Sequence, residues 1–153
     1  MPNVRESREI DYSAEQMYAL VADVKSYPEF LPWVVATRVK SDEGGVMIAD
    51  MMVGFKAFRE KFTSRVTKRP PEHITVEYIE GPLSHLENNW DFVPLGPDRC
   101  RIDFCVDFAF RNPVFEALAG QYLDRAFRKM VGAFERRAES LYGSSSSSAT
   151  SVA

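Results

Sequence analysis

The sequence has few of the residues that build reactive centres. In 153 residues it contains two cysteines, Cys100 and Cys105, and two histidines, His73 and His85. These four residues lack the spacing of metal ligands, and neither histidine has a partner recognisable along the chain. The pair that begins at Gly44 is typical of a hairpin turn, and no glycine-rich phosphate loop occurs. We therefore expect no catalytic residues, no metal site and no cofactor.

The two cysteines are also too few for a disulfide framework. An odd separation within one strand points their side chains to opposite faces of a sheet, so Cys100 and Cys105 should not bond to each other. Two free thiols are typical of a reducing compartment.

Long hydrophobic runs and an excess of either charge are missing as well. No apolar run approaches the ~20 residues of a membrane-spanning helix, and residues 1–6 lack the basic and apolar regions of a signal peptide. We therefore expect a cytoplasmic protein. The 19 basic and 22 acidic residues give a net charge of −3. This charge gives no overall electrostatic reason to bind nucleic acid or membrane, DNA included, although a local patch could still provide one.

Aromatic residues, in contrast, are abundant, with 11 Phe, 6 Tyr and 2 Trp. The remaining composition is that of an ordinary globular domain, and at roughly 150 residues per domain the chain has room for one core. Residues 143–153 are rich in serine and too polar to bury anything, so we expect a disordered tail after a single domain at residues 1–142. The aromatic excess within that domain requires an explanation.

The first third of the chain predicts one strand followed by helical segments. Val4 to Ile10 alternate as in a strand. Ser13 and Gln16 form the capping-box pattern that begins a helix, and Pro28 limits its continuation. Residues 27–33 place two prolines among three aromatics, which suits a short helical turn or a stiff connection.

The remainder predicts a strand meander and then a long helix. Turn residues punctuate residues 33–110 at intervals of about 10 to 15 positions, which indicates about six antiparallel strands. In the last strand, Cys100 to Phe110 alternate apolar with mostly charged side chains, so one face of the sheet is expected to be wet. Asn112 and Pro113 are a typical N-cap and first position for a helix that reaches Tyr142.

This order of elements predicts a cavity or a large aromatic core. One helix is about 10 Å wide, whereas seven strands at ~4.8 Å cover some 30 Å. The sheet must therefore curl around the helix, giving a two-layer α+β domain. The space between them is either filled by large side chains or left as a ligand pocket.

Two polar residues fall on the expected inner face of the strand at residues 55–68. Glu60 and Ser64 share that face with Phe62. A carboxylate on an apolar face is costly unless it is paired, hydrated or functional. Glu60 is therefore either a ligand-facing group or a wet residue near a bulge or strand edge.

Several motifs, in this order, resemble the coenzyme Q-binding protein family over residues 3–142. They are Tyr27-Pro28-x-Phe30-Leu31-Pro32-Trp33, Val53-Gly54-Phe55-Lys56 followed by Glu60, Phe62, Ser64 and Val66, Gly81-Pro82-Leu83 with Leu86 and Trp90-x-Phe92, Phe108-x-Phe110, and Met130-Val131-x-Ala133-Phe134-Glu135. The family belongs to the START-like, polyketide cyclase and lipid-transport superfamily, whose bacterial members are often labelled oligoketide cyclases or ribosome-association toxins. Many members have cysteine after the Pro-Trp pair, where this chain has Val34.

The resemblance implies a helix-grip fold, in which a curved antiparallel sheet of about seven strands wraps around a long C-terminal helix. It also implies non-catalytic binding of ubiquinone or a related isoprenoid lipid, in support of respiratory electron transport or quinone biosynthesis. Transient contact with a membrane or respiratory complex, peripheral at the inner membrane, would follow. The residues it assigns to the ligand site are Phe30, Trp33, Glu60, Phe62, Ser64, Trp90, Phe92, Phe104, Phe108, Tyr122, Leu123 and Phe127.

Two other functions stay open at this point. A toxin-like protein that binds the ribosome and blocks subunit association could dock on ribosomal RNA, or on anionic lipid, through the cations of the last helix, which are Arg125, Arg128, Lys129, Arg136 and Arg137. Nearby acidic residues dilute that charge, and a solvated helix face is the simpler interpretation. A polyketide cyclase would need only a shaped cavity and a few polar groups. For each aromatic residue taken singly, plain core packing remains the alternative to ligand contact.

Overall fold

The sequence forms seven strands and four helical segments in the order that its pattern predicts. The structure is a computed structural model that describes residues 3–55 and 58–143, without the side chains of Phe55 and Phe58; the expected tail from residue 144 lies outside the described residues. The elements are β1 (Asn3–Ile10), α1 (Ala14–Ala22), the 3-10 helix η1 (Val24–Glu29), β2 (Val34–Glu43), β3 (Val46–Phe55), β4 (Phe58–Arg69), β5 (His73–Glu80), β6 (Leu83–Gly96), β7 (Arg99–Phe110), α2 (Pro113–Arg128) and α3 (Met130–Tyr142).

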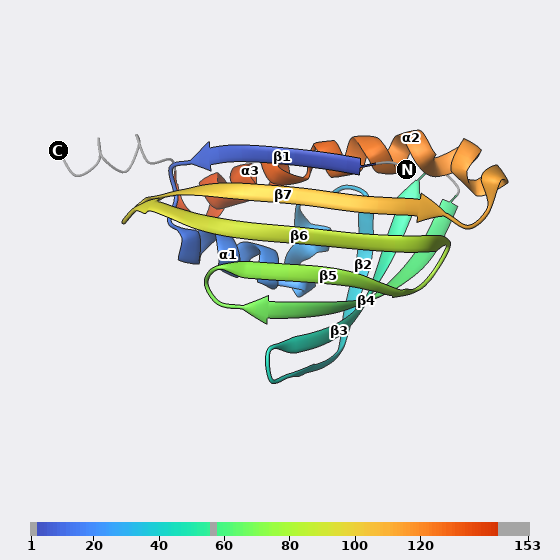
Figure 1. The fold of residues 1–153 in the computed structure, drawn as a ribbon, viewed down its shortest axis with the longest axis horizontal. Helices are drawn as coiled ribbons and strands as arrows, with labels where there is room; N and C mark the ends of the chain where they lie inside the picture. The colour runs from blue at the N-terminus through green and yellow to red at the C-terminus, as the bar shows by residue number, and fades with distance from the viewer. Residues whose placement is uncertain (1–2, 56–57, 144–153) are drawn as a thin grey trace.

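All seven strands form one antiparallel sheet in the order β1-β7-β6-β5-β4-β3-β2. Every neighbouring pair except β1 and β7 is joined by a short connection. Register shifts interrupt the pairing of β2 with β3, of β4 with β5 and of β6 with β7. Because such bulges bend a strand and increase its twist, they curl the sheet. In Figure 1, β2 stands steeply across the direction of β6 and β7.

The helices lie on one side of this curled sheet (Figure 1). The predicted start of α1 is confirmed, because the Ser13 hydroxyl accepts a hydrogen bond from the Gln16 backbone N–H at 3.1 Å and the Gln16 side chain accepts one from the Ser13 N–H at 2.9 Å. The predicted start of α2 is confirmed too, with Asn112 Oδ1 accepting from the Val114 N–H at 2.7 Å.

The C-terminal helical stretch covers the expected residues but is divided in two at Lys129. This residue keeps right-handed dihedrals, with φ −94° and ψ −4°. Its N–H points at both Arg125 O, at 3.1 Å, and Ala126 O, at 3.2 Å. An N–H shared between the third and fourth preceding carbonyls tightens a helix locally. The predicted single helix is therefore two consecutive helices, α2 and α3.

Alternation along β7 places the core as expected. Cys100, Phe104 and Phe108 face the helices and are buried, whereas Cys105 faces outward and is half-buried, and both thiols are free. Burial raises the pKa of the Cys100 thiol to about 11. The aromatic residues meet at Phe134, whose ring lies edge-on to Tyr27, Phe30 and Trp90 with centroid distances of 5.4, 5.1 and 5.3 Å.

Strand β6 offers a matched test of this core. Phe92 is 2% exposed, whereas Leu95 on the same strand is 44% exposed. We expect Phe92→Ala to lower the free energy of unfolding by about 3–5 kcal/mol, since it leaves a cavity, and Leu95→Ala to change it by less than about 0.5 kcal/mol. Urea denaturation followed by circular dichroism measures both, and similar losses would contradict this placement of the core.

Candidate functional site

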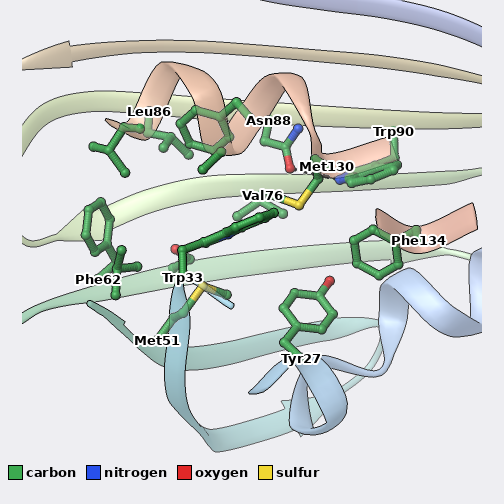
Figure 2. A pocket seen from close by; sticks show the side chains of 15 residues that line it. Tyr27, Trp33, Met51, Phe62, Val76, Leu86, Asn88, Trp90, Met130 and Phe134 are labelled. Carbon is green, nitrogen blue, oxygen red and sulfur yellow. Dashed lines mark hydrogen bonds between the residues drawn. The ribbon is translucent and has the colours of Figure 1, made fainter. Parts of the chain in front are cut away.

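A cavity lies between the curled sheet and the helices. Its volume is about 100 Å³. Figure 2 shows side chains from η1, from strands β3 to β6 and from the two C-terminal helices pointing into it. The lining residues are Tyr27, Trp33, Met51, Val53, Phe62, Ser64, Val76, Leu86, Asn88, Trp90, Leu123, Ala126, Phe127, Met130 and Phe134.

The walls are mainly aromatic and aliphatic, and Trp90 is held rigidly among them. Its indole N–H donates to Asn88 Oδ1 at 2.8 Å. The Asn88 amide nitrogen in turn donates to the backbone oxygen of Cys105 on β7 at 2.9 Å. These two bonds satisfy a buried amide and a buried indole and fix the orientation of the ring.

Three polar groups reach the cavity. Asn88 is engaged as described, and the Tyr27 hydroxyl donates to the backbone oxygen of Val21. Complete burial raises the pKa of Tyr27, so this hydroxyl is neutral at physiological pH. The Ser64 hydroxyl, by contrast, has no hydrogen-bond partner among the described residues. Among the hydroxyl and amide groups of this wall, it is the one that remains available to a bound molecule.

The lining contains no acidic, basic, histidine or cysteine side chain within the described residues. In the same part of the chain no three potential metal ligands gather in one place. The cavity therefore offers an apolar surface, a few aromatic faces and one available hydroxyl. This chemistry suits binding of an apolar molecule more than proton transfer.

A small space beside α2, which we call the neck, shares wall residues with the cavity and with a hollow at the surface. Val53, Phe62 and Leu123 line the cavity and also a space of about 20 Å³ beside it, which Glu60, Phe115, Ala119 and Tyr122 complete. The Tyr122 hydroxyl donates to Gly54 O at 3.0 Å and so ties α2 to β3 at this point. An outer hollow of about 380 Å³ follows, lined by Glu60, Pro82, Arg111, Asn112, Val114, Phe115 and Leu118.

The structure brings half of the sequence-predicted site residues together in the cavity wall. They are Trp33, Phe62, Ser64, Trp90, Leu123 and Phe127. Glu60 and Tyr122 lie at the neck instead, and Glu60 is half-buried there. Both earlier interpretations of Glu60 are compatible with this position, because it lines the space next to the cavity and is partly exposed to solvent.

Four predicted residues lie behind the wall and not in it. Phe104 lies edge-on to Trp90 at 4.7 Å between centroids, Phe92 is stacked on Trp90 at 6.1 Å, and Phe108 lies against Phe127 at 5.0 Å. Phe30 packs on Phe134, and the Arg137 guanidinium lies over the Phe30 ring, 4.9 Å from its centroid. These rings support residues of the wall. Strand alternation marks a residue as inward but does not tell whether it borders the cavity or lies in the core behind it.

Sequence reasoning missed nine lining residues. The alternation of β3 marks Met51 and Val53 as inward, and that of β6 marks Asn88, between Leu86 and Trp90, so a signal existed for those residues. The nine are Tyr27, Met51, Val53, Val76, Leu86, Asn88, Ala126, Met130 and Phe134.

One histidine does have partners, on the opposite face of the sheet. His73 Nδ1 lies 2.6 Å from Asp91 Oδ1, and its Nε2 lies 2.5 Å from Thr75 Oγ1. Register alone brings Asp91 beside His73, which the sequence could not reveal. The Thr75 hydroxyl also contacts Asn89, at 2.8 Å, and the surrounding backbone is engaged in strand pairing. The cluster therefore has a hydroxyl, an imidazole and a carboxylate but no evident site for an oxyanion.

A curved antiparallel sheet that grips C-terminal helices around an apolar cavity defines a helix-grip protein. The chain belongs to the polyketide cyclase/dehydrase and lipid transport family, whose sequence profile matches residues 10–135. No helix in the described residues is both long enough and apolar enough to cross a membrane.

Two curated relatives carry different functional names. The chain is 38% identical over 142 residues to coenzyme Q-binding protein COQ10 homolog B, mitochondrial, from Xenopus laevis, covering 90% of this chain but 58% of that protein. It is 37% identical over 142 residues to the ribosome association toxin RatA from Escherichia coli K12, covering 93% of this chain and 90% of that one.

Solved structures agree with the fold. The solution structure of an 18 kDa protein from Caulobacter crescentus is 34% identical, with a TM-score of 0.73 and coverage of 94% of this chain and 100% of that one. An aromatase/cyclase from Streptomyces sp. R1128 reaches a TM-score of 0.74 at 18% identity, covering 90% of this chain and 93% of that one, and this likeness shows the fold alone.

The two polar residues of the wall should differ in their effect on stability. Asn88→Ala removes the acceptor of the buried Trp90 indole N–H, so we expect a loss of about 1–3 kcal/mol in the free energy of unfolding. Ser64→Ala removes a hydroxyl that has no hydrogen-bond partner among the described residues, so we expect a change within about 0.5 kcal/mol. Denaturant unfolding of the ligand-free protein measures both. An equal loss in the two variants would show that Ser64 has a structural bond.

Proposed function

We propose that this protein binds ubiquinone or a similar isoprenoid quinone without catalysing its conversion, and so supports respiratory electron transport or quinone biosynthesis. The observation that carries the proposal is the apolar cavity with an available Ser64 hydroxyl and no charged side chain in its described lining. The 38% identical relative named as a coenzyme Q-binding protein supports the same ligand class.

The ligand is held by its apolar parts and oriented by one polar contact. Burying ~400 Å² of isoprenoid surface at ~25 cal/mol per Å² supplies about 10 kcal/mol gross, from which immobilisation and transfer out of a bilayer subtract. The Ser64 hydroxyl donates to a quinone carbonyl, which adds about 0.5–1.5 kcal/mol. A carrier that must also release its ligand needs only modest net affinity.

The cavity must widen to hold such a ligand. Its volume of about 100 Å³ is below the ~300 Å³ at which small-molecule sites begin. Helix α2 is the wall that can yield, because it buries only Ala119, Leu123 and Ala126 over 16 residues, whereas the shorter α3 buries Val131, Ala133, Phe134 and Ala138. Movement of α2 about Lys129 would break the bond from Tyr122 to Gly54 and open the neck.

Extraction and fluorescence test this proposal together. We expect protein purified from its native host to carry an isoprenoid quinone detectable by mass spectrometry of an organic extract. Trp33 and Trp90 are the only tryptophans and both line the cavity, so a short-chain ubiquinone should quench most of the tryptophan emission on binding. Absence of enriched quinone, together with absence of saturable quenching, would refute the proposal.

Two alanines on α2 provide matched variants for the same titration. Ala126 is buried and lines the cavity, whereas Ala117 is exposed. Ala126→Leu fills part of the cavity and should weaken quinone binding about tenfold or more, since overpacking typically costs 1–3 kcal/mol. Ala117→Leu should leave the dissociation constant within about twofold. Equal affinities in the two variants would place the ligand elsewhere.

Ribosome association is the second candidate, and the outer face of the sheet favours it. On that face, strands β2 to β4 carry the exposed cations Arg38, Lys40, Arg59, Lys61 and Arg65. Strands β5 to β7 carry the acids Glu77, Glu87, Asp91, Asp103 and Asp107, with Arg99 and Arg101 among them. We call the first group the basic half-face. The pKa of Asp50 lies below its usual value, mainly because Asp50 accepts a hydrogen bond from Thr63 and also because Lys40, Lys61 and Arg38 are near. This carboxylate therefore stays ionised among the cations of the basic half-face.

The basic half-face predicts salt-dependent binding to ribosomal particles. Lys61→Glu combined with Arg65→Glu should reduce co-sedimentation with purified ribosomal subunits about tenfold or more, and wild-type binding should fall steeply with added salt. Lys25→Glu, at an exposed cation on η1, is the control and should have little effect. No co-sedimentation of the wild type at low salt would eliminate this candidate.

A further inference from the structure

Helix α2 has a second unusual face, directed away from the cavity. At about 100° per residue, Val114, Leu118, Gln121 and Arg125 follow one stripe of the helix, and all four are exposed. Val114 is 67% exposed and Leu118 57%, more than any other large hydrophobic side chain among the described residues. We call this stripe the outer face of α2.

The acidic side chains of this helix are not part of the outer face. The acids Glu116 and Asp124 lie beside the outer face, where they border a hollow with Phe110 and Gly120 and with Gln121 and Arg125 of the outer face itself. Asp124 is paired with Arg128 at 2.8 Å. The outer face itself is thus apolar toward its N-terminal end and basic toward its C-terminal end, without an acidic residue.

The apolar end adjoins the outer hollow, which we take as the mouth of the cavity. Val114 and Leu118 line this hollow with the exposed Arg111 and with Glu60, which also lines the neck. A further exposed aliphatic residue, Ile79, lies near the end of β5, just before the connection to β6. In Figure 1 the N-terminal end of α2 lies beside the end of β7, at one extremity of the molecule.

We propose that the outer face of α2 docks on the surface of an anionic lipid bilayer, with Val114 and Leu118 at the acyl boundary and Arg111 and Arg125 at the headgroups. A bilayer surface matches both halves of the stripe, since an interfacial helix buries aliphatic side chains while its cations contact anionic lipid. An RNA surface would match the arginines but leave the two most exposed aliphatic side chains without a partner.

This contact rests on the proposed quinone binding and gives it a route. With the mouth against the bilayer, an isoprenoid tail passes from the acyl region into the neck without crossing water. The helix that closes the cavity is also the helix that meets the membrane, so docking and opening involve the same element.

Vesicle pelleting with matched variants tests the surface. Full-length protein is mixed with vesicles of phosphatidylcholine and phosphatidylglycerol, and the bound fraction is measured after centrifugation. Leu118→Glu should lower the partition coefficient about tenfold or more, whereas Leu95→Glu, at an exposed leucine far from α2, should change it by less than about twofold. Circular dichroism confirms that each variant is folded. Equal binding of the two variants, or retention of an RNA by the wild type without retention by vesicles, overturns the inference.

A second variant separates this inference from the proposed function. Arg125→Glu reverses a charge on the outer face outside the residues of the mouth, and should reduce binding to the anionic vesicles about tenfold while quenching by short-chain ubiquinone without vesicles stays within about twofold. Wild-type protein that binds the quinone but no vesicle refutes the docking surface alone. Protein that pellets with vesicles but binds no quinone refutes the ligand and upholds the surface.

Discussion

The mismatch in width between the sheet and its helices governs this structure. Seven strands span about 30 Å if laid flat, and one helix covers about 10 Å. Bulges in three strand pairs curl the sheet toward the helices, and the abundant aromatic residues fill most of the enclosed space. Phe134 on α3 contacts three of these rings, which are Tyr27 on η1, Phe30 directly after η1, and Trp90 on β6. The cavity is the part of that space that the rings leave open, bounded by the less buried α2.

This division of labour between the two C-terminal helices explains how a small domain can be both stable and able to admit a ligand. The segment α3 holds the aromatic core, and its Phe134 and Ala138 are fully buried. The segment α2 buries only Ala119, Leu123 and Ala126 and is joined to α3 through Lys129. Loss of α2 contacts therefore costs less than loss of α3 contacts, which places the low-stability element where access to the cavity is needed.

Much of the fold followed from local patterns, and much of the site did not. The Ser13 and Asn112 caps and the alternation of β7 were predicted correctly because they depend on neighbouring residues. The interruption at Lys129 was not, since no proline or cap marks it and the helix keeps its hydrogen bonds through it. Phe104 and Phe108 share the inward face with Trp90, so only the depth of the curled sheet decides which rings border the cavity. His73 and Asp91 meet through strand register, which residue spacing does not encode.

The uneven distribution of charge on the outer face of the sheet creates a lateral electric dipole across that face. The basic half-face and the acidic strands lie side by side on one sheet. The net charge of −3 is small, so it does not reveal this separation. In the field of any extended polyanion such a dipole experiences a torque, so the molecule turns its basic edge forward before contact. Ionic strength should then control how often a collision is productive more than how long the resulting complex lasts.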